Sequence, residues 1–244
     1  MDLSEVLAVQ QRFSTAQNMA QLKEIFLEAS KKLQFDSFIY ALRTPTNFSN
    51  AQVIMLDGYP EGWVKHYFEA AYYETDPVVT WCIHEILPIR WSDLVLESGS
   101  SAEAMMRDAA EYGLRDGVTM PVHTPQGELG ILSLSVDAQP EQARVITEAA
   151  LSIVPLLATH LHQAVRRLGN FSTEVHSNLT IRERECLTWA ADGKTSGEIA
   201  MLLGISDNTV NFHLNNAMQK LDVVSRQHAI GKASFQRLIK PKPF

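Results

Sequence analysis

Aromatic and acidic residues between positions 59 and 91 have the types and spacing of a small-molecule site. Tyr59, Trp63 and Tyr67 recur every four residues, so they would share one face if this segment is helical. Asp76 precedes a proline, which favours an extended backbone at the acidic residue. A carboxylate among aromatic rings would suit a ligand with an amide head and an apolar tail. The opposing interpretation is that the rings fill a core and Asp76 caps a helix, and the residue types alone favour it.

Short helical patterns near the C-terminus could form a nucleic-acid-binding module, and they cover residues 181–191, 195–203, 206–220 and 225–237. Thr180 and Glu183 have the spacing of a capping box at the start of the first pattern, and Gly193 ends it. A tight turn at Gly204-Ile205-Ser206 separates the second pattern from the third, which Ser206 caps. A helix, a short turn with glycine and a second helix form a helix-turn-helix.

The 206–220 helix would present polar side chains on its outward face. In a helix-turn-helix the second helix enters the major groove, and its N-terminal half contacts base edges. Its outward residues are Asn208, Asn211, Phe212, Asn215 and Gln219. An asparagine amide can pair bidentately with adenine for about 1–3 kcal/mol of discrimination. Phosphate contacts are predicted for side chains at or near helix N-termini and for cations, namely Lys194, Thr195, Ser196, Asn208, Thr209, His213 and Lys220. The alternative is that all of these are solvated residues of a helical bundle.

Charge is unevenly distributed along the 244 residues, whose net charge is −7. Residues 1–170 hold 12 basic and 21 acidic residues, whereas residues 171–244 hold 9 and 7, which leaves the C-terminal part at +2. A basic segment after an acidic body is consistent with contact to a polyanion. No apolar stretch reaches the roughly 18 residues of a membrane span, and no signal peptide is seen. With only two cysteines, far apart, we expect a cytosolic protein that makes no membrane contact.

Neither an enzyme nor a phosphorylated receiver domain is predicted. The sequence contains no G-x-S-x-G, Walker, H-E-x-x-H or G-x-G-x-x-G motif. His160 and His162 would point about 200° apart on a helix, so they cannot share a metal ion, and we expect no metal or cofactor. A receiver would begin with a strand followed by a helix, whereas residues 4–33 have a helical pattern.

The N-terminal pattern predicts an antiparallel sheet with helices on its faces. Segments rich in β-formers cover residues 37–42, 51–56, 118–123 and 129–136. Helical patterns cover residues 18–33, 61–71, 102–112 and 140–168, the last bent at Pro155. We therefore expect an α+β sandwich at 1–168, a polar linker at 169–178 and an all-α, four-helix helix-turn-helix domain at 179–244.

The C-terminal module resembles the DNA-binding domain of LuxR-type regulators. The similarity lies in the run LTIRERECLTWAADGKTSGEIAMLLGISDNTVNFHLNNAMQKLDVVSRQHAI, in which nearly every core and capping position matches. By position in this motif, the resemblance implies base contacts by Asn211 and Asn215. Two-component response regulators carry the same module, so this match alone does not indicate a quorum-sensing receptor.

The N-terminal domain resembles the acyl-homoserine-lactone-binding domain of LuxR-type receptors. The spacing of Trp63, Tyr67, Asp76-Pro77, Trp91 and Gly117 matches that domain, and the stretch LRDGVTMPVHTPQGELGILSLSVDA is similar to LasR-type members. The resemblance covers nearly the whole chain. It implies an α-β-α sandwich with the lactone between the sheet and one helical layer.

The resemblance implies a role for each head-group residue. Trp63 would donate its indole N–H to the lactone carbonyl, and Asp76 would accept the ligand amide N–H in a charge-assisted bond. Tyr59 would donate its hydroxyl hydrogen to the amide carbonyl. Ser133 would join Tyr59 at that carbonyl.

Further residues would enclose the ligand in the same resemblance. Tyr67 and Trp91 would wall the head group, and Thr119 on a neighbouring strand is an additional candidate. Val78 stands where relatives carry a polar residue, which argues against a contact to a 3-oxo group there. Candidates for the wall around the acyl tail are Ala41, Val79, Leu129 and Ile131.

The sequence thus predicts a transcription regulator that responds to an N-acyl homoserine lactone autoinducer. A twofold homodimer would present two recognition helices to an inverted-repeat site in double-stranded DNA, and an activator would also contact RNA polymerase. Two alternatives are a regulator of the same build that answers another small molecule or none, and an adaptor whose helical bundle binds protein. The sequence does not indicate the acyl-chain length, the operator or the direction of regulation.

Overall fold

The computed structural model describes residues 1–47, 50–125, 127–169 and 178–240. The chain divides into two compact units, Met1–Phe171 and Ser172–Phe244. Each unit has its own hydrophobic core. The predicted linker at 169–178 falls almost entirely outside the described residues.

The first unit is built on an antiparallel sheet, which within the described residues has five strands in the order β2-β1-β5-β4-β3. The strands are β1 (Ser37–Pro45), β2 (Ala51–Gly58), β3 (Ile89–Arg90), β4 (Asp116–His123) and β5 (Leu129–Val136). The sequence pattern did not predict β3, which has only two residues. Thr119 of β4 and Ile39 of β1 both pair with Ser133 of β5. Because side chains alternate between the faces of a strand, directly paired residues project from the same face of the sheet.

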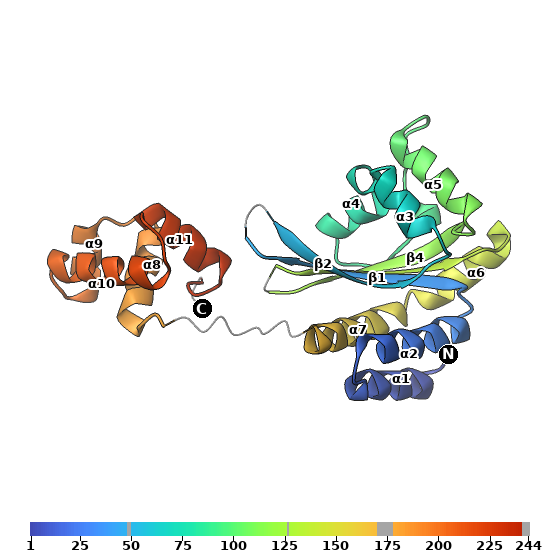
Figure 1. The fold of residues 1–244 in the computed structure, drawn as a ribbon, viewed down its shortest axis with the longest axis horizontal. Helices are drawn as coiled ribbons and strands as arrows, with labels where there is room; N and C mark the ends of the chain where they lie inside the picture. Colours follow the sequence, from blue (N-terminus) through green and yellow to red (C-terminus); the bar gives the residue numbers. More distant parts are fainter. Residues whose placement is uncertain (48–49, 126, 170–177, 241–244) are drawn as a thin grey trace. The chain divides into compact units, whose positions relative to one another are not determined.

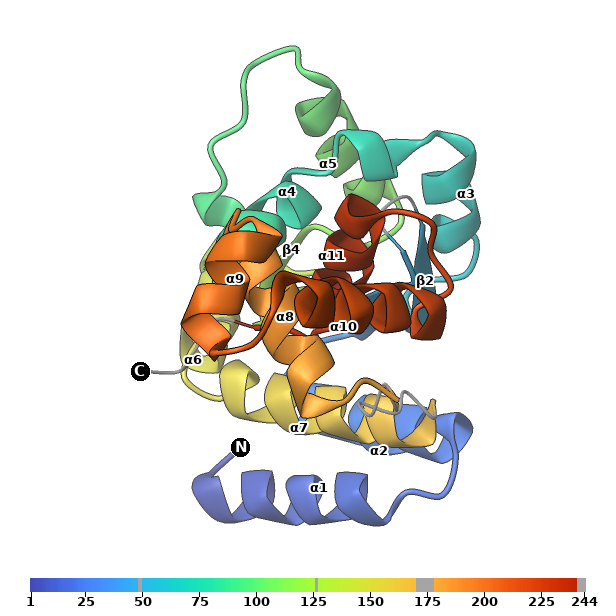
Figure 2. The same ribbon diagram turned by 90° about the vertical axis from the view of Figure 1, so that its left-hand side faces the viewer.

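One face of the sheet is covered by helices from both ends of the unit (Figure 1). They are α2 (Met19–Lys32), α6 (Pro140–Ala150) and α7 (Val154–Leu168). Helix α1 (Leu3–Thr15) packs outside them, against α2 and α7, as Figure 2 also shows. The main core lies in this layer, and its fully buried side chains include Phe13, Phe26, Phe38, Leu132 and Leu157.

The bend predicted within 140–168 is present, but it separates two helices, α6 and α7, and does not lie at Pro155. The two helices make an angle of 65°. The break comes at residues 151–153 rather than at Pro155, which lies in the first turn of α7. Proline is tolerated there because the first N–H groups of a helix have no intrahelical partner. No single described helix is long and apolar enough to cross a membrane; only α6 and α7 counted together across their bend reach that length and composition.

Shorter elements cover the other face of the sheet (Figure 1). They are α3 (Trp63–Glu69), the 3-10 turn η1 (Tyr72–Glu74), α4 (Pro77–His84), the 3-10 turn η2 (Trp91–Asp93) and α5 (Ser101–Glu111). Gly113 follows α5 with a φ of 84°, as expected for the residue that ends a helix. With helices on both faces, the unit is the expected α-β-α sandwich.

The second unit has four helices in its described part, α8 (Ile181–Ala191), α9 (Ser196–Leu203), α10 (Asp207–Lys220) and α11 (Arg226–Phe235). The predicted capping box of Thr180 and Glu183 is present, and Ser206 caps α10. Gly204 joins α9 to α10 with a φ of 65°, a left-handed conformation that glycine adopts at little cost. The helix-turn-helix prediction is confirmed, and its buried side chains include Ile199, Ala200, Val210, Leu214 and Ala217.

Candidate ligand site and DNA-binding surface

A cluster of aromatic and apolar side chains lies between the sheet and helices α3 to α5. This aromatic cluster comprises Tyr59, Trp63, Tyr67, Tyr72, Val78, Trp81, Cys82, Trp91, Leu94, Met105, Met106, Ala109, Tyr112, Leu114 and Ile131. Trp63 has the most ring neighbours: its centroid is 5.3 Å from that of Tyr112 and 6.1 Å from those of Tyr67 and Tyr72. Its side chain is 4% exposed. Within the described part of the chain its indole N–H donates no hydrogen bond, so a donor is available inside the cluster.

Tyr59 enters the aromatic cluster from outside the helix. Helix α3 begins only at Trp63, after Gly62 with a φ of 86°, so the predicted helical face holds for Trp63 and Tyr67 but is wrong for Tyr59. Burial raises the pKa of Tyr59, while the neighbouring Ser133 hydroxyl acts in the opposite direction. The phenol therefore stays protonated, and it lies near the serine predicted to share its role.

Asp76 combines the two roles that the sequence left open. It caps α4, with Oδ1 accepting from the backbone N–H groups of Val78 at 2.7 Å and Val79 at 3.2 Å. Its other oxygen, Oδ2, accepts the Tyr67 hydroxyl hydrogen at 2.9 Å. Burial raises the pKa of Asp76, and these hydrogen bonds partly oppose that effect. A carboxylate oxygen can accept more than one hydrogen bond, so Oδ2 has capacity for a further donor.

A chain of buried hydrogen bonds connects Trp91 to Ser133. The Trp91 indole N–H donates to the Thr119 hydroxyl at 2.8 Å, and the Thr119 and Ser133 oxygens are 2.8 Å apart. Thr119 is fully buried, and both of its hydroxyl contacts are to protein. Gly117 permits this arrangement, because a Cβ there would lie 2.9 Å from Trp91 Cε2 and 2.4 Å from the Leu134 carbonyl oxygen. Thr119 thus orients Trp91 and Ser133.

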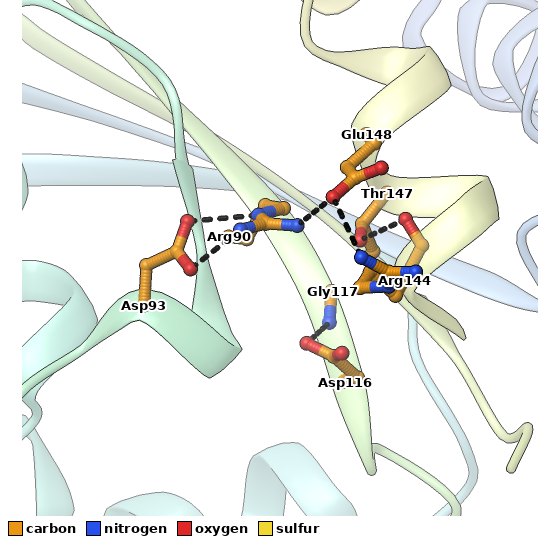
Figure 3. A network of polar contacts seen from close by, with 7 residues as sticks. All are labelled: Arg90, Asp93, Asp116, Gly117, Arg144, Thr147 and Glu148. Carbon is orange, nitrogen blue, oxygen red and sulfur yellow. Dashed lines mark hydrogen bonds and ion pairs between the residues drawn. The ribbon is translucent and has the colours of Figure 1, made fainter. Parts of the chain in front are cut away.

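Arg90 anchors the turn that carries Trp91. Its guanidinium group makes a bidentate pair with Asp93, at 2.8 Å and 2.7 Å, and its third nitrogen donates to Glu148 of α6 at 2.9 Å. Figure 3 shows the guanidinium between the two carboxylates, with Arg144 on the far side of Glu148. The pKa of Arg90 is raised chiefly by the hydrogen bond to Asp93. This network ties η2, on one face of the sheet, to a helix that covers the other face.

The sequence reasoning missed Asp108 of α5. Its carboxylate accepts from the Tyr72 hydroxyl and lies 3.5 Å from His66 Nε2, so it connects α5 with η1 and α3. The Tyr72 hydrogen bond lowers the pKa of Asp108 and raises that of Tyr72. No local signal marks this residue, because its partners are 36 and 42 positions away.

The residues predicted to wall an acyl tail lie on three elements, β1, β5 and α4. Ile131 packs against the aromatic cluster, and Ala41 is its partner across β1 and β5. Leu129 is buried further along β5, and Val79 lies on α4. Among the described residues, no group of three His, Cys, Asp or Glu side chains could hold a metal ion.

The outward face of α10 carries the predicted base contacts. Asn211 and Asn215 are both exposed, one helical turn apart. The Ser196 hydroxyl, on the first residue of α9, donates to Asn211 Oδ1 at 2.8 Å. Phe212 is 60% exposed, and its ring contacts that of His213 at 5.7 Å between centroids.

Several predicted phosphate contacts have partners inside the protein. Lys220 Nζ lies 2.8 and 2.9 Å from the two carboxylate oxygens of Glu183, whose side chain is 3% exposed, so this lysine stabilises the start of α8. The Thr195 hydroxyl donates to Glu198 at 2.9 Å within a capping box, and Thr209 Oγ1 is 2.8 Å from Ser206 Oγ. These groups would have to exchange partners to reach DNA.

Other predicted phosphate contacts remain available in the described structure. The side chains of Lys194 and Asn208 make no hydrogen bond or ion pair there, and Asn208 is exposed next to the start of α10. Two nearby arginines are engaged, since Arg226 donates to the Lys194 carbonyl and Arg182 pairs with Glu185 at 2.9 Å.

A sandwich domain with an aromatic and acidic cluster, followed by a helix-turn-helix, defines a ligand-responsive DNA-binding regulator. Comparison with known families makes the assignment specific. Residues 18–165 match the autoinducer binding domain, and residues 177–233 match the luxR family of bacterial regulatory proteins. The chain therefore belongs to the LuxR family of transcription regulators, which are not enzymes.

Individual relatives agree with this assignment along the whole chain. The transcriptional activator AhyR of Aeromonas hydrophila is 31% identical, and the match covers 99% of this chain and 94% of that protein. The activator AnoR of Acinetobacter nosocomialis is 33% identical, with 91% of this chain and 93% of that protein covered. Among solved structures, SdiA in complex with octanoyl-rac-glycerol has a TM-score of 0.74 at 28% identity and covers 98% of this chain and 97% of its own.

Proposed function

We propose that this regulator binds an N-acyl homoserine lactone within the aromatic cluster and thereby controls its binding to DNA. The observation that supports it most directly is the unpartnered indole N–H of Trp63, in the same cluster as the buried Asp76 carboxylate. A lactone carbonyl needs a donor, and an amide N–H needs an acceptor; this pair offers one of each.

The remaining head-group contacts follow from the hydrogen-bond geometry. Thr119 accepts from Trp91, so its own hydrogen can be directed to Ser133. The Ser133 hydrogen is then available, with that of Tyr59, for the ligand amide carbonyl. Tyr67 and Trp91 enclose the head group, and the acyl tail runs along Ala41, Val79, Leu129 and Ile131.

Ligand binding and stability are coupled in this proposal because the ligand becomes part of the core. Burial contributes roughly 0.8 kcal/mol per methylene, so about eight methylenes approach ~6 kcal/mol. A whole domain is stable by only ~5–15 kcal/mol. Occupancy of the cluster therefore stabilises the folded regulator by mass action.

DNA binding is proposed to require a homodimer that recognises an inverted-repeat site. Lys220 is paired with Glu183, and the exposed positions 211, 212 and 215 of α10 carry no lysine or arginine, so this helix alone makes limited ionic contact with phosphates. Two recognition helices on adjacent half-sites add their affinities. Contact with RNA polymerase is proposed if the protein activates transcription, as its relatives named activators do.

The test is the melting temperature of the purified full chain with a series of N-acyl homoserine lactones of increasing acyl length. We expect a rise of several degrees that peaks at one length. Trp63→Phe should abolish most of the rise, whereas Trp81→Phe, which alters another tryptophan of the aromatic cluster, should retain it. No rise at any length, with a stable and DNA-binding protein, would contradict the proposal.

A second candidate ligand class is a monoacylglycerol. SdiA, which is similar over nearly the whole chain, has been solved with octanoyl-rac-glycerol. An acylglycerol ester provides acceptors for Trp63, Tyr59 and Ser133, and its free hydroxyl groups, in place of an amide N–H, can donate to Asp76. The same melting experiment with N-octanoyl homoserine lactone and 1-octanoyl-glycerol at equal concentrations separates the two ligands, because the preferred head group gives the larger rise in melting temperature.

A further inference from the structure

The exposed N-terminal half of α10 offers amide and aromatic groups for base contact and no lysine or arginine. Asp207 and Asn208 are exposed in its first turn, and Asn211, Phe212 and Asn215 are the exposed side chains between positions 211 and 215. Arginine or lysine paired with guanine is the commonest specific contact in the major groove. Its absence from these three positions removes the usual means of selecting G·C pairs.

Asn215 and Phe212 both have the chemistry of A·T recognition. The Asn215 amide makes no hydrogen bond within the described residues, so its oxygen and nitrogen are both available for the bidentate pair with adenine N6 and N7. Phe212 is 60% exposed, so its ring is available for an apolar contact. The thymine methyl group is the apolar feature that the major groove presents.

Asn211 differs from Asn215 because Ser196 determines its orientation. The 2.8 Å bond from Ser196 Oγ holds Asn211 Oδ1 against α9, which leaves the NH2 group as the end that is free to meet DNA. An NH2 group can only donate. Guanine, adenine and thymine each present a major-groove acceptor, whereas cytosine presents a donor. Asn211 in this orientation can therefore donate to guanine, adenine or thymine but not to cytosine.

We propose that each operator half-site is read as adjacent A·T pairs by Asn215 and Phe212, and that Ser196 is a specificity-determining residue that makes Asn211 a donor. This inference rests on the proposed function, in which α10 enters the major groove. It assigns Ser196 a role in base preference beyond the phosphate contact that its position at a helix N-terminus suggests.

The test is selection from a randomised duplex library with the full chain, in the presence and absence of N-octanoyl homoserine lactone. We expect selected half-sites with neighbouring A·T pairs beside one position that tolerates every base except cytosine. Asn215→Ala should lower the preference for adenine at one position by about tenfold, the size of one bidentate pair. Gln219→Ala, an exposed residue at the other end of α10, should leave the selected sequence unchanged.

Ser196→Ala provides the sharper result, because it frees the Asn211 amide to pair bidentately. We expect the tolerant position to narrow to adenine, while Ser196→Thr, which keeps the hydroxyl, retains the original pattern. A uniform loss of affinity on all duplexes would show a phosphate contact only and would overturn the role of Ser196. Selection of G·C pairs beside Asn215 would overturn the proposed recognition of A·T pairs but would leave the proposed function in place. Failure to bind any duplex under either condition would overturn both.

Discussion

Tyr67 donates its hydroxyl hydrogen to Asp76 Oδ2 across 2.9 Å, while the other oxygen of Asp76 caps α4. The pair joins two neighbouring elements of the aromatic cluster, α3 and α4. One carboxylate therefore has both a structural and a proposed ligand-binding role, and its protonation state should affect each of them.

Ligand-induced stabilisation should depend on pH through Asp76. Burial raises its pKa, so as the pH falls the carboxylate becomes protonated at a higher pH than an ordinary aspartate would. On protonation it loses its charge-assisted bond to the ligand amide. In the ligand-free protein the raised pKa has the opposite effect on the pH dependence of stability: the contribution of Asp76 to the free energy of unfolding declines as pH rises through that range. The measurement is the ligand-induced shift in melting temperature from about pH 4 to pH 8.

Two variants separate these effects. Tyr67→Phe removes a hydrogen bond that lowers the pKa of Asp76, so the loss of ligand stabilisation should move to higher pH. Asp76→Asn should remove the pH dependence together with most of the stabilisation. An unchanged pH profile in both variants would mean that Asp76 only caps α4.

Thr119→Val should destabilise the first unit by about 1–3 kcal/mol, because it leaves the buried Trp91 N–H without an acceptor. Adding Trp91→Phe removes that N–H, so the double variant should lose less than the sum of the two single variants. Urea unfolding of the four proteins measures the coupling. Strict additivity would show that the hydrogen bond contributes nothing to stability.

Gly130→Ala should disrupt a second buried hydrogen bond, between Tyr40 and His162 at 2.7 Å. A Cβ at position 130 would lie 2.6 Å from both the Tyr40 hydroxyl and His162 Nδ1. Overpacking of this kind costs typically 1–3 kcal/mol. In a Tyr40→Phe background, which removes one of the two close contacts, the penalty for Gly130→Ala should be smaller; an equal penalty in both backgrounds would contradict this explanation.

The buried His162 should make stability fall on mild acidification. Burial lowers its pKa to about 4, from 6.5, so the unfolded state takes up a proton first as pH falls. Stability from this group is complete above about pH 6.5 and is lost progressively towards pH 4. His162→Gln should flatten the curve of unfolding midpoint against pH in that window, whereas His160→Gln, an exposed histidine on the same helix, should not.

Arg90→Gln should loosen the turn that carries Trp91. It removes the bidentate pair with Asp93 and the bond to Glu148, around a guanidinium that is 18% exposed, and we expect a loss of about 1 kcal/mol. Arg144→Gln is the matched control, since that pair is 3.9 Å long and its arginine is 67% exposed. Equal effects of the two variants on urea unfolding would contradict an anchoring role for Arg90.

Helix caps and helix-turn-helix boundaries were predictable because they depend on residues a few positions apart. Thr180 with Glu183, and Ser206 before α10, bond within a single helical turn, so their spacing in the sequence is sufficient. The strand pairing of β4 with β5 follows in the same way from a short hairpin. The break before α7 departs from the prediction because proline is tolerated in the first turn of a helix, so Pro155 follows the break.

By itself, then, the sequence determined the two domains, their order, their fold class and the residue types that gather in each site. Tertiary structure decided the partners: Lys220 with Glu183 across 37 positions, Trp91 with Thr119 across 28, and Ser196 with Asn211 across 15. A side chain of a given type can bond any nearby group, and only the packing of helices and strands determines which group is near. Asn211 is predicted as a base contact from its position on α10, yet which group of its amide faces DNA depends on Ser196 of α9.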